Sequence, residues 1–135
     1  MISFVSLPCG ARFHEAFTAH VPSVTSKEGL ILEVSTRLHF PLKCGMNWDA
    51  LNDILSYTYW LEERRVVIVH DERPELTREE LAIYLGVLRH VMADTLVYEG
   101  RAYDEIDVVF PLEAYDSVQH AIVDSIRRDE LRGSL

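Results

Sequence analysis

Apolar residues recur along the chain in two patterns, as short unbroken runs and at spacings of three and four positions. Residues 66–69 are an unbroken β-branched run, which is typical of a strand buried on both faces of a parallel sheet. Residues 106–110 predict a second strand of this kind, and residues 2–7 and 13–19 are shorter candidates. The chain is therefore expected to contain several short strands.

Helical spacing occupies the intervals between these runs. Ser26 or Thr25 can cap a first helix, and Pro41 is predicted to stop it. Thr77 opens a later helix, because Glu80 stands three positions on, at the spacing of a capping box. The apolar positions of these two helices, which share the spacing of one buried face, are Leu30, Ile31, Val34 and Leu38, then Leu81, Tyr84, Leu85, Leu88, Val91 and Met92.

A further amphipathic pattern lies at the C-terminus and extends to about residue 131. Its expected apolar face comprises Leu112, Tyr115, Val118, Ile122 and Ile126. Helices that alternate with buried strands predict a small α/β domain with a largely parallel sheet.

The composition is that of one globular domain with an acidic surface. At 135 residues, the chain is expected to form a single domain over residues 1–135. Asp and Glu number 22 against 13 Lys and Arg, which gives a formal net charge of −9. Because binding to phosphates needs positive charge, this balance argues against a nucleic-acid partner and favours a basic protein partner.

Cysteine and histidine usage indicates neither a disulfide framework nor a metal site. Cys9 and Cys44 have no paired spacing and are expected to be reduced thiols. The six histidines lack the spacing of zinc ligands, and no nucleotide-binding glycine motif occurs, so no metal and no cofactor are expected.

The N-terminus has no basic leader, and no window has the roughly 18 apolar residues of a membrane span. These features predict a cytoplasmic protein.

Residues 47–57 predict a helix with two distinct faces. The apolar face, at the spacing of buried positions, comprises Leu51, Ile54, Leu55 and Thr58. The polar face carries Asp49, Asn52, Asp53 and Ser56. Asp49 lies near the positive end of the helix dipole, but Asp53 repels it by a few tenths of a kcal/mol and no Lys or Arg lies one turn away. This face is either simply solvated or kept ready for cations of a partner.

The string from Pro41 to Leu55 resembles the signature of the barstar family of intracellular ribonuclease inhibitors. In that family, a proline and a Gly-x-Asn-(Trp/Leu)-Asp-Ala-Leu-x-Asp-x-Leu string open the second helix. Eight residues match it in register: Gly45, Asn47, Trp48, Asp49, Ala50, Leu51, Asp53 and Leu55.

The order of elements over residues 13–110 also fits this family. The resemblance implies a barstar-like α/β fold, with a small, mainly parallel three-stranded sheet packed with helices. Residues 1–12 and 111–135 lie outside it. They could add an edge strand and a covering C-terminal helix, or form a second contact surface.

By the same resemblance, the second helix and its preceding loop would enter the basic active site of a ribonuclease, without catalysis of their own. The partner-binding positions carried over are Gly45, Asn47, Trp48, Asp49, Asn52, Asp53 and Ser56. Asp49 and Asp53 would be the main anionic contacts, standing in for substrate phosphates. Trp48 could be a contact or a core anchor, and core packing is favoured for a Trp beside a helix start.

The chain departs from the family pattern in three places. Lys43 and Cys44 replace an aromatic pair before the glycine, and Asn52 replaces an aromatic residue between the two acids. An acidic contact expected on the third helix would fall near Arg89 and His90, where the sequence has none. A toxin different from the usual ribonuclease would tolerate these differences.

Two other classes of function stay open from the sequence. His70 and Asp71 follow a parallel strand, at the edge where ligands gather in open α/β sheets, and could serve a small enzyme. An exposed loop entry is the simpler interpretation of these residues. Residues 99–116 hold six acids and only Arg101, so an interaction domain with a non-nuclease partner is the other alternative.

Overall fold

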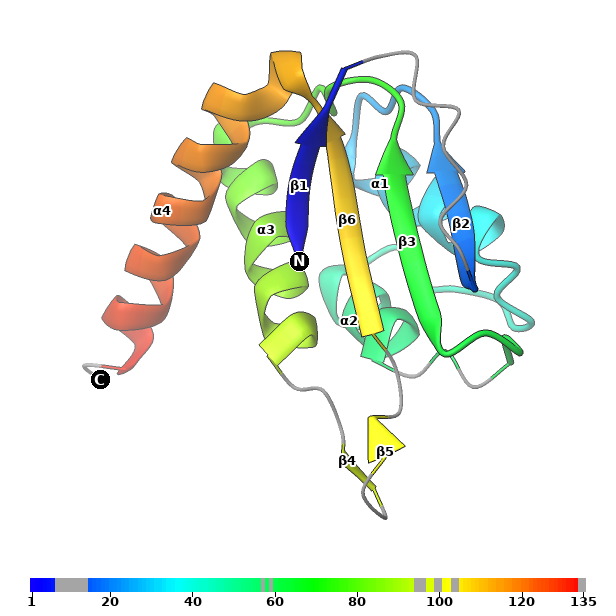
Figure 1. Cartoon of the computed structure of the whole chain (residues 1–135). Coiled ribbons are helices and arrows are strands. Elements are labelled where there is room, and N and C mark those ends of the chain that lie inside the picture. The colour runs from blue at the N-terminus through cyan, green and yellow to red at the C-terminus, as the bar shows by residue number, and fades with distance from the viewer. Residues whose placement is uncertain are drawn as a thin grey trace.

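A sheet of four parallel strands, in the order β1-β6-β3-β2, forms the centre of the protein, and β4 and β5 pair in a separate two-stranded sheet (Figure 1). The computed structural model describes residues 1–6, 15–56, 58, 60–93, 97–98, 101–102 and 105–133. The described elements, in chain order, are β1 (Ile2–Val5), β2 (Ala16–Val21), α1 (Lys27–Arg37), α2 (Trp48–Ser56), β3 (Arg65–His70), α3 (Arg78–Ala93), β4 (Val97–Tyr98), β5 (Arg101–Ala102), β6 (Glu105–Pro111), the 3-10 helix η1 (Leu112–Ala114) and α4 (Tyr115–Gly133). The predicted α/β class, the parallel sheet with its extra edge strand, and the C-terminal helix are confirmed.

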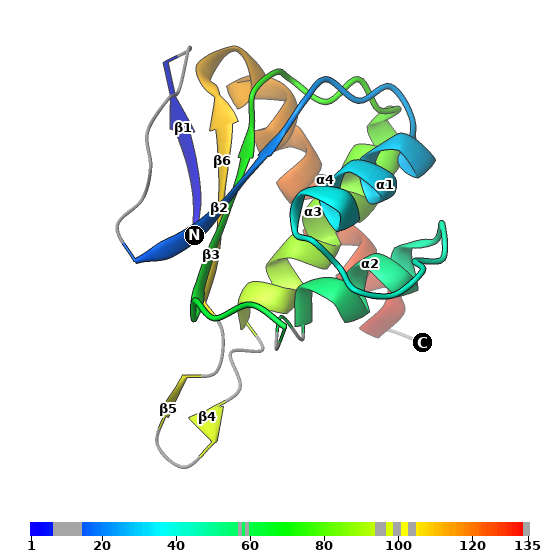
Figure 2. The same cartoon turned by 90° about the vertical axis from the view of Figure 1, so that its right-hand side faces the viewer.

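Strand β3 is central because its β-branched side chains are buried on both faces. It pairs in parallel with β2 on one side and with β6 on the other. Val66 and Ile68 join the core on the side of the helices, whereas Val67 and Val69 cluster with Val109 on the opposite face. All of α1–α4 lie on one side of this sheet (Figure 2). The unbroken apolar run therefore corresponds to a strand covered on both faces, as predicted.

Strand β2 and helix α1 have bounds that differ slightly from the predicted ones. Strand β2 is Ala16–Val21, and residues 7–14 lie outside the described part of the chain. Ser26 caps α1, since its Oγ accepts a hydrogen bond from the Gly29 N–H at 3.0 Å. The helix ends at Arg37, before Pro41 is reached, so the predicted stop at this proline is wrong. The cause is a Schellman turn around His39, which has a positive φ of 56°.

The capping box of α3 is confirmed by its two reciprocal hydrogen bonds. The Thr77 N–H donates to Glu80 Oε1, and the Glu80 N–H donates to Thr77 Oγ1, both at 3.1 Å. The predicted apolar face of α3 is buried at Leu81, Tyr84, Leu85, Leu88 and Val91, and Met92 is partly buried. This helix packs on the sheet and also contacts α2 and α4.

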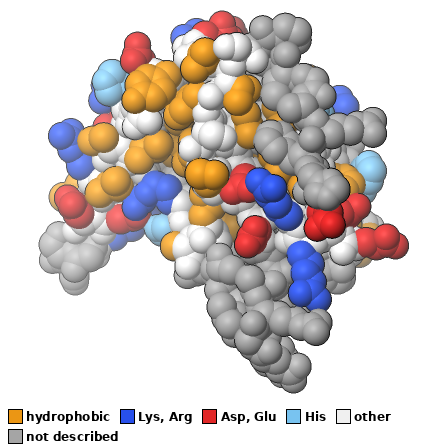
Figure 3. All heavy atoms as spheres, in the orientation of Figure 1, with side chains coloured by type: hydrophobic (Ala, Val, Ile, Leu, Met, Phe, Trp, Pro, Cys, Tyr) orange, Lys and Arg blue, Asp and Glu red, His pale blue; other side chains and the backbone are white. Residues whose placement is uncertain are grey.

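The C-terminal helix buries only part of the predicted face, since Val118 is buried and Ile122 is partly buried against the core. The buried positions of α4 also include Ala121 and Ser125, and Ala114 is buried in the preceding η1, whereas Leu112, Tyr115 and Ile126 are 53%, 49% and 39% exposed. The reason is close packing against α3, because a Cβ built at Gly86 would already touch Ser125 Cβ at 3.6 Å. Small side chains fill this contact, so the large ones lie outside it, and Figure 3 shows apolar side chains over α4 and the neighbouring β1.

His70 is buried within the core, so the prediction of an exposed loop entry at this residue is wrong. It is the last residue of β3 and is only 1% exposed. Its ring stacks on Phe110 with centroids 4.8 Å apart, and its Nε2 lies 2.7 Å from the Tyr84 hydroxyl. Nδ1 has no hydrogen-bond partner among the described residues. Burial disfavours the imidazolium and lowers the pKa of His70 from 6.5 to about 3.

This burial makes the free energy of unfolding depend on pH. In the unfolded chain the pKa of His70 returns to 6.5, so between this pH and about 3 the unfolded state binds a proton that the folded state does not. The free energy of unfolding should therefore fall as pH falls through this window, by up to about 1.4 kcal/mol per pH unit from this group. Denaturant titrations from pH 7 to pH 4 measure the slope.

The variant His70→Gln should have a shallower slope than the wild type, whatever its absolute stability. The matched control is His120→Gln, since His120 is an exposed histidine on α4. It should keep the wild-type slope. Parallel pH profiles for wild type and His70→Gln would contradict this account of His70.

Candidate functional site

Helix α2 is fixed at its start by a side-chain cap. Asn47 Oδ1 accepts a hydrogen bond from the Ala50 N–H at 2.8 Å, and α2 begins at the next residue, Trp48. Leu51, Ile54 and Leu55 anchor the helix because they are buried in the core. The predicted helix at residues 47–57 thus corresponds to α2, except that Tyr57 lies outside the described residues.

The polar face of α2 points away from the core. Asp49 and Asp53 are exposed, and Asn52 and Ser56 are half-buried. Asp49 and Asp53 form no ion pair with any residue that the structure describes. Two carboxylates one helical turn apart therefore stand in solvent with their charges uncompensated within this part of the chain.

The loop before α2 lies close to its cap. A Cβ built at Gly45 would meet Asn47 Nδ2 at 3.3 Å, so any larger residue there would press on the capping side chain. Lys43 is exposed, and Cys44 is a half-buried free thiol. Burial raises the pKa of the Cys44 thiol, although a hydrogen bond with Ser35 lowers it in part. Gly45 and Asn47 thus determine together how the chain enters α2.

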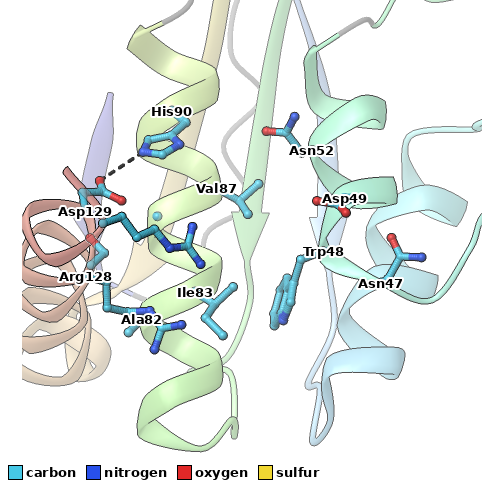
Figure 4. A pocket seen from close by; sticks show the side chains of 13 residues that line it. Asn47, Trp48, Asp49, Asn52, Ala82, Ile83, Val87, His90, Arg128 and Asp129 are labelled. Carbon is cyan, nitrogen blue, oxygen red and sulfur yellow. Dashed lines mark hydrogen bonds and ion pairs between the residues drawn. The ribbon is translucent and has the colours of Figure 1, made fainter. Parts of the chain in front are cut away.

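Trp48 packs against the core, as favoured from the sequence, and its role as a partner contact stays a prediction. It is half-buried and packs against the core, and its side chain also lines a groove beside α2. Figure 4 shows the indole directed toward α3, near Ile83, rather than outward with the polar face of α2. Its position is consistent with an anchor that also forms part of the surface.

The groove has a volume of about 540 Å³ and lies between α2, α3 and α4. Asp49 and Asn52 of α2 and the capping residue Asn47 contribute polar groups to it. Ile83, Gly86 and Val87 of α3 form its floor, and Arg128, Asp129 and Arg132 line it from α4 (Figure 4). Asp53 is not among its lining residues. Asp49 therefore stands at the groove, and Asp53 lies one turn further along α2.

The end of α4 is tied to α3 by a charged cluster. Asp129 Oδ2 lies 3.0 Å from His90 Nε2 and 3.1 Å from Arg89 Nη1. Arg89 also donates to Ser125 Oγ at 3.1 Å. The hydrogen bonds from His90 and then Arg89 lower the pKa of Asp129 below its ordinary value. An acid thus does lie beside Arg89 and His90, but the C-terminal helix supplies it.

The sequence interpretation did not include the contribution of α4 to this groove. Arg128 and Arg132 are four positions apart, and this spacing places them on one side of a helix. Their spacing could have been noticed in the sequence. Which neighbour they face depends on how α4 crosses α3, and no local pattern carries that information.

His70 and Asp71 do not converge on a common site. His70 is buried against Phe110 and Tyr84, whereas the Asp71 carboxylate lies 2.9 Å from His20 Nδ1. Among the described residues, no group of three or more His, Cys, Asp or Glu side chains is placed to hold a metal ion. In the same part of the chain, no helix has the length and apolarity needed to cross a membrane.

Comparison with protein families gives a match over most of the chain. Residues 14–110 match the family model described as Barstar (barnase inhibitor). No curated protein and no solved structure matches the chain. The matched region contains α2 and its preceding loop, and it ends before η1 and α4.

The cap of α2 leads to a prediction about stability. Asn47→Ala removes the side-chain acceptor for the Ala50 N–H and should lower the free energy of unfolding by about 1 kcal/mol, whereas Asn47→Asp should retain most of it. Denaturant unfolding measures both. Asn52→Ala on the same helix is the control, because no hydrogen bond of the Asn52 side chain to a described residue is seen, and it should stay within about 0.5 kcal/mol. Equal losses for Asn47→Ala and Asn52→Ala would contradict the capping role.

Proposed function

Since the chain belongs to the barstar family, we propose that it inhibits a specific nuclease, most simply a ribonuclease toxin of the cell that makes it. The polar face of α2 and the loop at Gly45 would occupy the basic active site of this enzyme in a one-to-one complex. Inhibition would need no cofactor and no chemical step. The chain would act as an immunity protein, by occupying the site where the RNA phosphates bind.

The observation that carries this proposal is the exposure of the Asp49 and Asp53 carboxylates and their lack of ion pairs among the described residues. Both carboxylates are exposed, belong to one helix anchored in the core, and have no ion pair among the described residues. A carboxylate on a rigid helix loses little conformational entropy when it binds. Arginine side chains of an RNA-binding site can each donate two charge-assisted hydrogen bonds to the oxygens of such a carboxylate. The pair can therefore substitute for two phosphates of a polynucleotide.

The acidic character of the whole chain supports the same partner. A net charge of −9 raises the rate at which a basic enzyme encounters the protein, and added salt screens this attraction. The complex should therefore form faster at low ionic strength. Asp49 and Asp53 on α2 would then form the short-range contacts that fix the orientation of the two proteins in the complex.

The direct test is retention and inhibition of a nuclease. The purified protein is immobilised, an extract of the cells that produce it is passed over it, and the eluate is assayed for RNA cleavage. We expect a retained ribonuclease whose activity is abolished when soluble protein is added at a one-to-one ratio. An eluate without nuclease activity, or activity that the protein does not inhibit, would contradict the proposal.

The variant Asp53→Ala tests the role of the α2 face. The dissociation constant for the retained ribonuclease should rise roughly 30-fold or more, because a desolvated cation of the enzyme would lose its partner. Thermal unfolding should change little, since the variant removes an exposed charge and relieves the repulsion with Asp49. Inhibition titrations and thermal melts measure the two effects.

The control Glu72→Ala removes one negative charge from an exposed residue in the loop after β3. Figure 1 shows the end of β3 at the top of the sheet and α2 at the bottom. The control variant should lower affinity only slightly, through the change in net charge. If Asp53→Ala and Glu72→Ala behaved alike, the α2 face would not be the docking surface.

A further inference from the structure

The groove beside α2 has walls of opposite charge. The α2 wall presents Asp49, and the α4 wall presents Arg128 and Arg132. Asp129 also lines the α4 wall, but its carboxylate is held by Arg89 and His90 of α3. Figure 4 shows Arg128 extending from α4 toward the groove, over the apolar floor that α3 provides. Such a groove suits a ligand that carries a cation and an anion side by side, since each charge can then face its opposite.

The two arginines are not needed to hold α4 in place. Arg78 pairs with Asp124 at 2.8 Å, Arg89 pairs with Asp129 at 3.1 Å, and buried Val118 and Ala121 pack into the core. Among the described residues, Arg128 pairs with Glu79 alone, at 3.5 Å, and the glutamate side chain is 73% exposed, so the pair contributes little. Arg132 forms no ion pair with the described residues.

A helix-end effect accounts for only part of this arrangement. Arg132 lies in the last turn of α4, where a positive charge favourably meets the helix dipole. That effect would be served equally by an arginine on any side of the last turn. It does not explain why Arg128 and Arg132, one turn apart, both line the groove next to the face of α2.

We propose that α4 is a second recognition element, and that Arg128 and Arg132 bind a carboxylate-bearing segment of the same nuclease, next to its basic active site. This inference rests on the proposed function, because the occupant is the enzyme that docks on α2. An arginine pair on a helix can hold a carboxylate by bidentate, charge-assisted hydrogen bonds. The occupant is thus a nuclease surface on which acidic side chains border the cationic cleft.

Long-range electrostatics alone would not predict that removing these arginines weakens binding. A loss of affinity can therefore be distinguished from an effect of net charge. The protein has a formal charge of −9 and its proposed partner is basic. Loss of a positive charge far from the interface should therefore leave association unchanged or slightly faster. A loss of affinity requires a short-range contact between the arginine and a negative group.

The experiment compares the double variant Arg128→Ala/Arg132→Ala with Arg127→Ala. Arg127 is an exposed arginine on the same helix and is not among the groove residues, so it is the matched control. The probe is the ribonuclease retained by the immobilised wild-type protein. We expect the double variant to raise the dissociation constant at least about tenfold, mainly through faster dissociation, and Arg127→Ala to leave it unchanged or lower. Arg132→Glu should weaken binding more than Arg132→Ala does.

Thermal melts verify that the variants stay folded, and Asp53→Ala is measured alongside them. If the double variant behaves as Arg127→Ala does while Asp53→Ala still loses affinity, the inference about α4 is wrong and the inhibitor proposal stands. If neither variant changes affinity, the inference about α4 and the inhibitor proposal are both wrong.

A labelled single-stranded RNA oligonucleotide is the second probe. Binding of this RNA by the wild type but not by the double variant would assign the arginines to phosphates and overturn the inference.

Discussion

The packing of α2 and α4 on α3 is the constraint on which the site depends. Helix α3 buries one face against the sheet and contacts α2 and α4 with its other sides. Fully burying Leu51, Ile54 and Leu55 contributes roughly 1.5–3 kcal/mol for each side chain. Repulsion between Asp49 and Asp53 costs only a few tenths of a kcal/mol. Burial of the apolar face of α2 therefore stabilises the helix by far more than the repulsion between its two exposed carboxylates destabilises it.

Local patterns in the sequence were sufficient for the parts of the fold that depend on local physics. The β-branched run at Val66–Val69 and the reciprocal cap of Thr77 and Glu80 are found as expected. The polar and apolar faces of α2 also follow from residue spacing alone. Their value for function remains a prediction, because exposure and the lack of a partner do not by themselves identify a docking surface.

The remaining features depend on tertiary packing. His70 stands before Asp71 and Glu72, so its surroundings in the sequence are polar, yet the end of β3 places its ring between Phe110 and Tyr84. Gly86 permits close contact with Ser125, so α4 buries small residues and leaves its larger apolar residues outside. The position of Arg128 and Arg132 beside α2 follows from the same contact. No pattern within one helix could predict it.

Asp107 and Asp124 differ from the two acids on the polar face of α2 because they have ion-pair partners. Asp107 meets the N-terminal ammonium group and Arg65, both at 2.8 Å, and Asp124 meets Arg78 at the same distance. These acids link strands or helices. Asp49 and Asp53 have no such counterpart in the described part of the chain, although arginines lie across the groove. The ion pairing that fixes Asp107 and Asp124 is thus not found on the α2 face among the described residues.

The two kinds of charge in the groove would act over different distances. A surface dominated by carboxylates attracts any basic protein, because long-range attraction depends on net charge and not on detail. Selectivity requires contacts that a wrong partner cannot satisfy. Burying Arg128 and Arg132 against a surface without a carboxylate would leave two guanidinium groups desolvated and unpaired, which is costly. The α4 wall would thus penalise basic proteins that merely match the overall charge, while the α2 wall supplies the attraction.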